Sequence, residues 1–208
     1  MQETNLSPKT KISLLKELML KTKNNHSLAL YATENLFVPG MGPEDAEIMV
    51  IGEAPGKEEA LQGKPFVGRS GQLLSRLLEE ENLSRSMLFI TNVVKYRPPN
   101  NKTPTYKECR AWAEAYLHQE IAIICPKIII TLGNCAARMF LGEKVCITNI
   151  QGKVFDIAEI KIIPMYHPAY LLRNKQAIQE VKKSLKNVKQ IHTEIVHNYV
   201  HNMFTTCA

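Results

Sequence analysis

Apolar residues follow two alternating patterns along this chain of 208 residues. Four short runs rich in Ile, Val, Leu and Met are bounded by turn-forming residues, which predicts buried β-strands. These runs cover residues 46–51, 87–94, 127–132 and 160–166. Between the runs, apolar residues repeat at helical spacing. The alternation predicts an α/β fold with three layers (α/β/α), in which helices cover both faces of a mostly parallel, four-stranded sheet.

Capping residues mark where the helices begin. Ser7 followed by Pro8 predicts the start of an N-terminal helix over 8–23. Thr105 and Glu108 have the spacing of a capping box and predict the start of another helix. The other expected elements are the body of that helix to about residue 124, helices around 73–78 and 134–141, a small hairpin over 147–155 that turns at Gln151-Gly152, and a Lys-rich helical tail over 174–208.

Composition and charge narrow the class of protein. A chain of this length with 45% hydrophobic residues suits one well-buried domain, so we expect a single domain over 1–208. The net charge of +6 and the pI near 9.0 favour a polyanionic partner. No apolar run has the length of a membrane span or the character of a signal peptide. We therefore expect an intracellular, cytoplasmic protein that does not bind membranes.

The cysteines give no sign of a disulfide framework or a metal site. They lie at 109, 125, 135, 146 and 207, so their number is odd and they form no CxxC pair. Such usage indicates reduced thiols in an intracellular protein. We therefore expect no metal ion.

Polar residues follow three of the predicted strands at their carboxyl ends, where open α/β sheets form their ligand crevice. Gly52-Glu53-Ala54-Pro55-Gly56 follows the first strand, Asn92 lies near the end of the second and His167 follows the fourth. A phosphate-binding P-loop is excluded, because only three residues separate the two glycines and Glu58 follows Gly56-Lys57. Each segment also has a structural explanation, namely a tight turn, a satisfied buried amide and a solvated imidazole.

Three blocks of sequence resemble the family 4 uracil-DNA glycosylases. They are IGEAPGKEEALQGKPFVGRSG at 51–71, TNVVKYRPP at 91–99 and YHPAYLLRN at 166–174. The resemblance covers about 30–174, which is the expected core. It implies an enzyme that flips deoxyuridine out of DNA and hydrolyses the N-glycosidic bond, releasing uracil and leaving an abasic site. We expect this chain to be a monomer that needs no metal and associates with nucleoid DNA.

The same resemblance assigns residues to uracil recognition. Phe66 is expected to stack on the base, with Gly52 and Ala54 beside it. Asn92 offers one acceptor and two donors, which match N3–H and O4 of uracil and mismatch cytosine. His167 is expected to contact O2 of uracil and to stabilise the leaving anion.

Acidic, apolar and basic residues complete the expected site. Glu53 and Glu59 are the acids nearest the flipped sugar, and the sequence leaves open which of them positions the water. Leu171, with Tyr170 and Leu172 as neighbours, is expected to fill the vacated base stack as a wedge. The basic residues that flank the blocks are candidates for phosphate contacts: Lys64, Arg69, Lys95, Arg97 and Arg173.

The chain departs from family 4 at the iron–sulfur cluster. By spacing, the four ligating cysteines correspond to Asn25, Leu28, Tyr96 and Trp112, and none of these supplies a thiolate. We predict that the cluster is absent, that no other cofactor is needed, and that aromatic packing replaces it. Two other interpretations are a sister glycosylase for hypoxanthine or xanthine, which Asn92 argues against, and a weakly catalytic DNA-binding subunit, which the intact pocket residues argue against.

Overall fold

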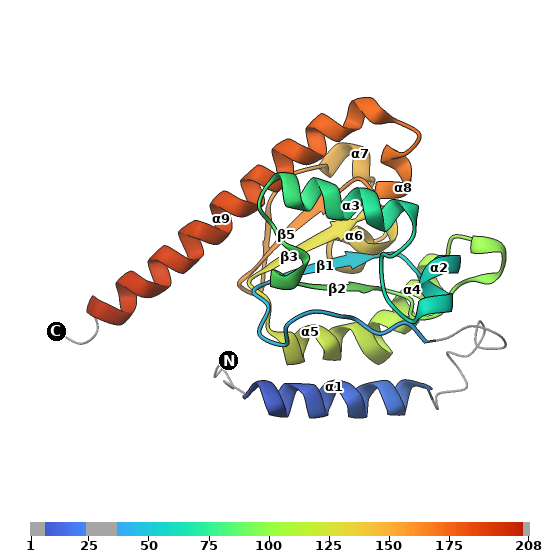
Figure 1. The fold of residues 1–208 in the computed structure, drawn as a ribbon, viewed down its shortest axis with the longest axis horizontal. Helices are drawn as coiled ribbons and strands as arrows, with labels where there is room; N and C mark the ends of the chain where they lie inside the picture. The colour runs from blue at the N-terminus through green and yellow to red at the C-terminus, as the bar shows by residue number, and fades with distance from the viewer. Residues whose placement is uncertain (1–6, 24–36, 206–208) are drawn as a thin grey trace.

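A central sheet organises the protein, whose computed structural model describes residues 7–23 and 37–205 (Figure 1). Over these residues the sheet has five strands in the order β2-β1-β3-β5-β4. The strands are β1 (Ile48–Gly52), β2 (Leu88–Asn92), β3 (Ile128–Leu132), β4 (Phe155–Ile157) and β5 (Ile160–Met165). The four predicted strands are all present and mutually parallel, whereas the short β4 adds an antiparallel edge that the prediction of four strands missed.

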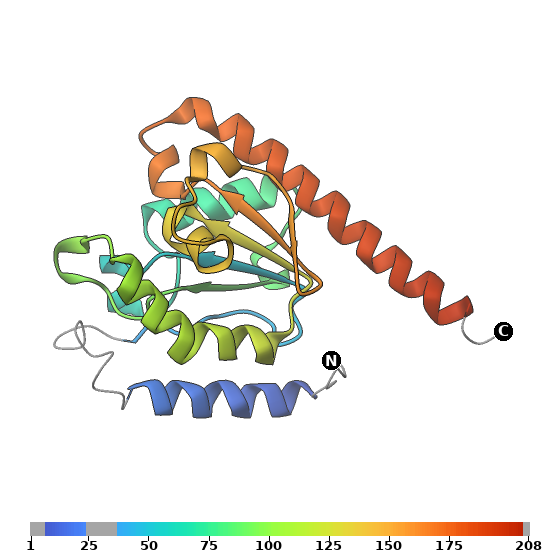
Figure 2. The same ribbon diagram turned by 180° about the vertical axis from the view of Figure 1, so that it is seen from behind.

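Helices cover both faces of the sheet, which confirms the predicted three layers (Figures 1 and 2). Successive side chains of a strand point to opposite faces. In β1, Ile48 and Val50 therefore pack toward α3, α8 and α9, while Met49 and Ile51 pack toward α1, α4, α5 and α6. The bounds are α1 Pro8–Lys23, α2 Lys57–Gln62, α3 Arg69–Glu80, η2 Arg85–Met87, η3 Pro99–Asn101, α4 Tyr106–Trp112, η4 Ala113–Leu117, α5 His118–Ile124, α6 Gly133–Leu141, α7 Ile147–Ile150, α8 Pro168–Leu171, η5 Lys175–Ala177 and α9 Ile178–Thr205.

The predicted helix starts are confirmed. Helix α1 has the predicted bounds. At the start of α4, the hydroxyl of Thr105 accepts from the backbone N–H of Glu108 at 3.3 Å, and the Glu108 carboxylate accepts from the N–H of Thr105 at 2.7 Å. The helical run continues through a π-helical turn in η4 and ends where Cys125 adopts a left-handed conformation with φ of 58°.

The predicted hairpin at 147–155 is wrong. Residues 147–150 form α7 because the side chain of Asn134 accepts the N–H of Ile147 at the start of this turn, at 2.7 Å. The hairpin lies later, where β4 and β5 are joined by Ala158 and Glu159, both with positive φ. The predicted tail is the long helix α9, whose first half packs on the sheet through Val181, Leu185 and Val188. No helix in the described part of the chain combines the length and apolar character that a bilayer crossing requires.

Candidate active site

The site forms where the parallel strands end together. The register pairs Gly52 at the end of β1 with Asn92 at the end of β2. Gly133 follows β3, and His167 follows β5 after Tyr166. The topology therefore brings the three predicted blocks to one edge of the sheet, as the sequence indicated.

Gly52, Phe66 and Asn92 converge at this edge. A Cβ atom on Gly52 would lie 2.4 Å from both Asn92 Oδ1 and Phe66 Cζ, so only glycine permits this approach. Asn92 is buried, and its Oδ1 has no hydrogen-bond partner among the described residues. A buried amide oxygen without a donor is costly, which indicates that a ligand supplies one. Ala54, by contrast, packs against the hydrophobic core.

Glu59 organises the loop that carries Phe66, here called the Phe66 loop (residues 65–68). Its Oε1 accepts from the backbone N–H of Val67 at 3.0 Å and of Gly68 at 2.8 Å. Gly68 is also the N-cap of α3. One oxygen of the buried Glu59 carboxylate is therefore bound to this loop, and Glu59 does not line the large cavity beside the site.

His167 has a defined hydrogen-bond state. Its Nδ1 accepts from the N–H of Ala169 at 3.1 Å, so the neutral ring carries its proton on Nε2. Burial lowers the pKa of His167 to about 4, against the opposing effect of the negative charge of Glu59. At neutral pH the imidazole is therefore an uncharged donor at Nε2. Its ring centroid lies 6.0 Å from that of Phe66.

Gly133 is a part of the site that the sequence reasoning missed. With φ of +83° it adopts a conformation that favours glycine, and a Cβ atom there would lie 3.2 Å from Cβ of His167. The signal for it was the position of a glycine directly after a buried strand, Ile128–Leu132. A side chain at this position would crowd Cβ of His167.

A cavity of about 470 Å³ opens beside His167. Glu53 lines this cavity, and burial raises the pKa of its carboxyl, although a hydrogen bond with the Thr103 side chain acts in the opposite direction. Glu53 and His167 are thus the two predicted catalytic residues that share the cavity. Its lining also includes Thr103, Gly133, Asn134, Cys135, Tyr166 and Tyr170.

The prediction that Leu171 is the wedge is wrong. Leu171 is 1% exposed and packs with Leu74 and Val181 in the core beneath α8. The single turn of α8 directs this side chain inward, whereas Tyr170 and Leu172 are each 39% exposed. Tyr170 lies near Tyr166, with 5.0 Å between ring centroids, and its hydroxyl accepts from the Asn174 amide at 2.6 Å.

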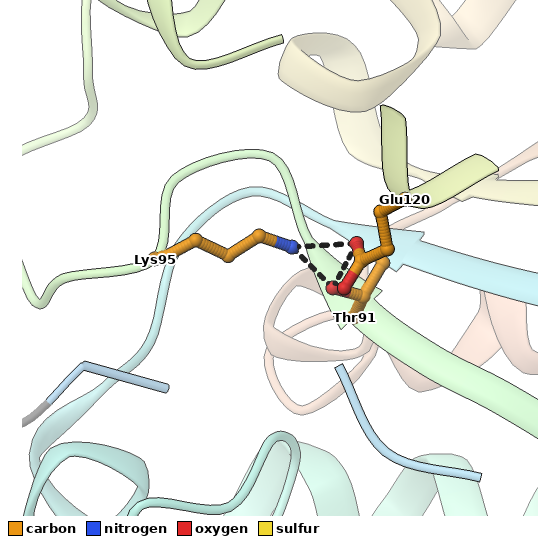
Figure 3. Close-up of polar contacts among 3 residues, drawn as sticks. All are labelled: Thr91, Lys95 and Glu120. Carbon is orange, nitrogen blue, oxygen red and sulfur yellow. Dashed lines mark hydrogen bonds and ion pairs between the residues drawn. The ribbon is translucent and has the colours of Figure 1, made fainter. Parts of the chain in front are cut away.

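The prediction that Lys95 contacts DNA phosphates is also wrong. Its side chain is fully buried and its Nζ lies 2.8 Å from Glu120 Oε2 (Figure 3). The same ammonium donates to the Thr91 hydroxyl, which donates to Glu120 Oε2 at 2.9 Å. Burial lowers the pKa of Lys95, and the charge and hydrogen bond of Glu120 oppose that shift. This pair is an internal link between the β2 exit and α5.

The remaining basic candidates differ in their exposure. Lys64, Arg69 and Arg173 are exposed. Arg97 is half-buried, and its Nε donates to Asn101 Oδ1 at 2.8 Å. The structure therefore retains three exposed cations around the loops that carry Phe66 and His167.

Two of the four positions that the spacing matches to cluster ligands are described, and both are buried aromatic residues. Tyr96 and Trp112 pack edge to face with 5.8 Å between centroids, and Phe37 lies 5.4 Å from Tyr96. The other two, Asn25 and Leu28, lie outside the described residues. Across 7–23 and 37–205 no group of three or more His, Cys, Asp or Glu side chains has the arrangement of a metal site. The described residues do not fit an iron–sulfur cluster.

Comparison with known proteins identifies relatives over most of the chain. The family model of the uracil DNA glycosylase superfamily matches residues 39–191. A type-4 uracil-DNA glycosylase of Thermotoga maritima is 38% identical over 189 residues, which are 87% of this chain and 98% of that protein. Type-4 enzymes of Archaeoglobus fulgidus and Saccharolobus solfataricus are 38% and 44% identical, covering 78% and 74% of this chain and 85% and 74% of those proteins.

Proposed function

The chain belongs to the uracil DNA glycosylase superfamily, and we propose that it excises uracil from DNA by hydrolysing the N-glycosidic bond of a flipped deoxyuridine. The observation that carries this proposal is the buried Oδ1 of Asn92, which has no hydrogen-bond partner among the described residues and lies near the ring of Phe66. Uracil N3–H supplies the missing donor, and its O4 accepts from the amide nitrogen. Cytosine offers an acceptor at N3 and donors at N4, so it leaves the buried amide mismatched.

His167 and Glu53 divide the chemistry between the base and the sugar. As the bond breaks, negative charge develops on uracil O2, and the Nε2–H of the neutral imidazole stabilises it. The carboxylate of Glu53 faces the cavity, where it positions the attacking water and stabilises positive charge on the deoxyribose. Glu59 acts on the Phe66 loop instead, since its Oε1 binds two amides there.

Contacts to DNA are assigned by exposure. Leu172 is the wedge, because it is exposed at the end of α8, while Leu171 is buried and Tyr170 is hydrogen-bonded to Asn174. Lys64, Arg69 and Arg173 contact phosphates, and Arg97 stiffens the loop after β2 through Asn101. The enzyme acts as a single-domain monomer on cytoplasmic, nucleoid DNA.

The enzyme needs no iron–sulfur cluster. Tyr96 and Trp112 supply no thiolate and fill the space between the β2 exit and α4 with apolar contacts. The loss of metal ligation is thereby compensated by the burial of aromatic surface.

A single-turnover assay on an oligonucleotide with one deoxyuridine tests the function. Release of free uracil is expected from the unsubstituted protein. His167→Ala should lower the rate by about 10²-fold or more while DNA affinity changes only a few-fold, because the imidazole acts on charge that exists only in the transition state. Binding without any uracil release would instead indicate a catalytically weak DNA-binding subunit, and release of hypoxanthine or xanthine alone would indicate a sister specificity.

A further inference from the structure

Phe66 has an unusual backbone for a bulky residue. Its φ of 53° lies in the left-handed region, which side chains with a Cβ rarely adopt. This conformation places the phenyl ring against Gly52 and Asn92. Because a strained conformation persists only where its surroundings enforce it, some group must hold the Phe66 loop in place.

The guanidinium of Arg85 binds the backbone of this loop. From η2 its Nη1 donates to the carbonyl oxygen of Phe66 and its Nη2 to that of Pro65, both at 3.0 Å. The same Nη1 donates to the Ser75 hydroxyl at 3.0 Å, and this hydroxyl donates to the Gly71 carbonyl. A planar fork of donors therefore binds two successive carbonyls and the first turns of α3 at once.

Two further contacts leave the loop little freedom. A Cβ atom on Gly71 would lie 2.0 Å from the carbonyl oxygen of Phe66, so the start of α3 touches the backbone of this loop. On the other side, Glu59 binds the amides of Val67 and Gly68. Arg85 thus binds the carbonyls of the loop while Glu59 binds its amides.

We propose that Arg85 is a positioning residue for uracil recognition, which holds Phe66 in its left-handed conformation so that the ring forms the stacking surface beside Asn92. This inference rests on the proposed function. Without the fork, Phe66 relaxes to an ordinary backbone conformation and its ring leaves Gly52. The affinity for the base should then fall, while the contacts of the protein with the DNA backbone should remain.

The variants Arg85→Ala and Arg85→Lys test this proposal. Lysine keeps the charge and most of the volume but lacks the planar fork that binds both carbonyls. Exposed Arg76 of α3 provides the matched control, Arg76→Ala. Circular dichroism melts establish whether each variant is folded. If Arg85→Ala does not fold, Arg85→Lys provides a folded variant for the test.

Inhibition by free uracil measures the base pocket alone. Both Arg85 variants should raise the inhibition constant for uracil. They should also lower the single-turnover rate, measured with enzyme in excess of DNA but below saturation, by about tenfold for alanine, a size typical of coupled neighbours. Affinity for DNA that carries an abasic site should stay within about twofold, as should every parameter of Arg76→Ala, since distant surface changes are small.

A double-mutant cycle with Phe66→Ala separates positioning from general stability. If Arg85 acts through the ring, Arg85→Ala should change the rate less than about twofold once the ring is gone, while its effect on the melting temperature remains. Additive losses of rate, or an unchanged inhibition constant for uracil in both Arg85 variants, would overturn the inference and leave uracil excision intact. Failure of the unsubstituted protein to release uracil would overturn the proposed function and this inference with it.

Discussion

Replacement of Lys95 by methionine removes the positive half of a buried ion pair. The side chains of Lys95 and Glu120 are 0% and 1% exposed, so Glu120 cannot regain water when its partner is lost. Its other oxygen, Oε1, already lacks a partner among the described residues. Breaking a buried pair from one side costs about 3–5 kcal/mol. We expect a loss at the upper end of that range because, among the described residues, Glu120 then keeps only its hydrogen bond from the Thr91 hydroxyl.

Urea denaturation and thermal melts measure this loss. For a chain of this size each 1 kcal/mol lowers the melting temperature by about 2–4 °C, so a fall of roughly 10 °C or more is expected. The matched control is Arg110→Met, which breaks the exposed pair with Glu114 and should have no measurable effect. The double variant Lys95→Met, Glu120→Leu removes both charges and should recover most of the stability, because apolar replacement of a whole buried pair is often neutral.

Two results would refute this reasoning. If Lys95→Met is as stable as Arg110→Met, the pair is solvated and Lys95 is free to reach DNA. If the salt dependence of DNA affinity also loses about one phosphate contact in Lys95→Met, the original phosphate assignment is restored. We expect the salt slope to be unchanged and the excision rate to fall, because the pair fixes Thr91 directly beside Asn92.

Three further predictions concern charge and packing at the site. Burial raises the pKa of Glu53 above its ordinary value of 4.5 and so disfavours its charged form. Glu53→Gln should therefore raise the melting temperature at pH 7 while lowering the excision rate by about 10²-fold or more. A variant less stable than the unsubstituted protein would contradict the view that the Glu53 carboxylate is destabilised by burial. The folded pKa of His167, about 4, lies below its ordinary 6.5, so the unfolded chain binds more protons between these values. Stability should fall as pH drops from 6.5 to 4, and His167→Gln should flatten that decline in urea titrations at stepped pH. Trp112 is 2% exposed, so Trp112→Ala should cost about 3–5 kcal/mol in the same assay, and a near-neutral variant would contradict the hypothesis that aromatic packing replaces the cluster. Protein purified without oxygen should be colourless and iron-free, and stoichiometric iron would contradict the hypothesis that the enzyme has no cluster.

The sequence predicted the parallel strands well because each is a short β-rich run with turn residues at its ends. The same information located Gly52, Asn92 and His167 at strand ends and so at one edge of the sheet. The short β4 escaped notice, since only three residues pair and two of them are exposed. The hairpin prediction failed because the helical turn at 147–150 depends on the side chain of Asn134, which lies 13 residues before Ile147 and is not part of the local pattern.

Errors at the site arose where neighbours in sequence point in different directions. Leu171 and Leu172 are adjacent and chemically identical, yet the turn of α8 buries one and exposes the other. Lys95 and Arg97 flank the same motif, but only Lys95 faces Glu120, which lies 25 residues later. Charge and motif membership therefore predicted which residues surround the site, whereas their orientation depended on contacts between distant elements.

Lys95 and Arg85 are two basic residues to which the sequence gave no correct role, and we propose that they support the two sides of the base pocket. Lys95 fixes Thr91, which precedes Asn92, and Arg85 fixes the backbone of Phe66. The buried Oδ1 of Asn92 has no partner among the described residues and Phe66 has a strained φ, so neither arrangement would persist on a loose scaffold. Recognition of an uncharged base gains most from such rigidity, because uracil offers few polar atoms and a misplaced amide would accept cytosine as readily. In this proposal, the charged side chains of Lys95 and Arg85 improve discrimination between uracil and cytosine because they hold the neutral Asn92 and Phe66 in place.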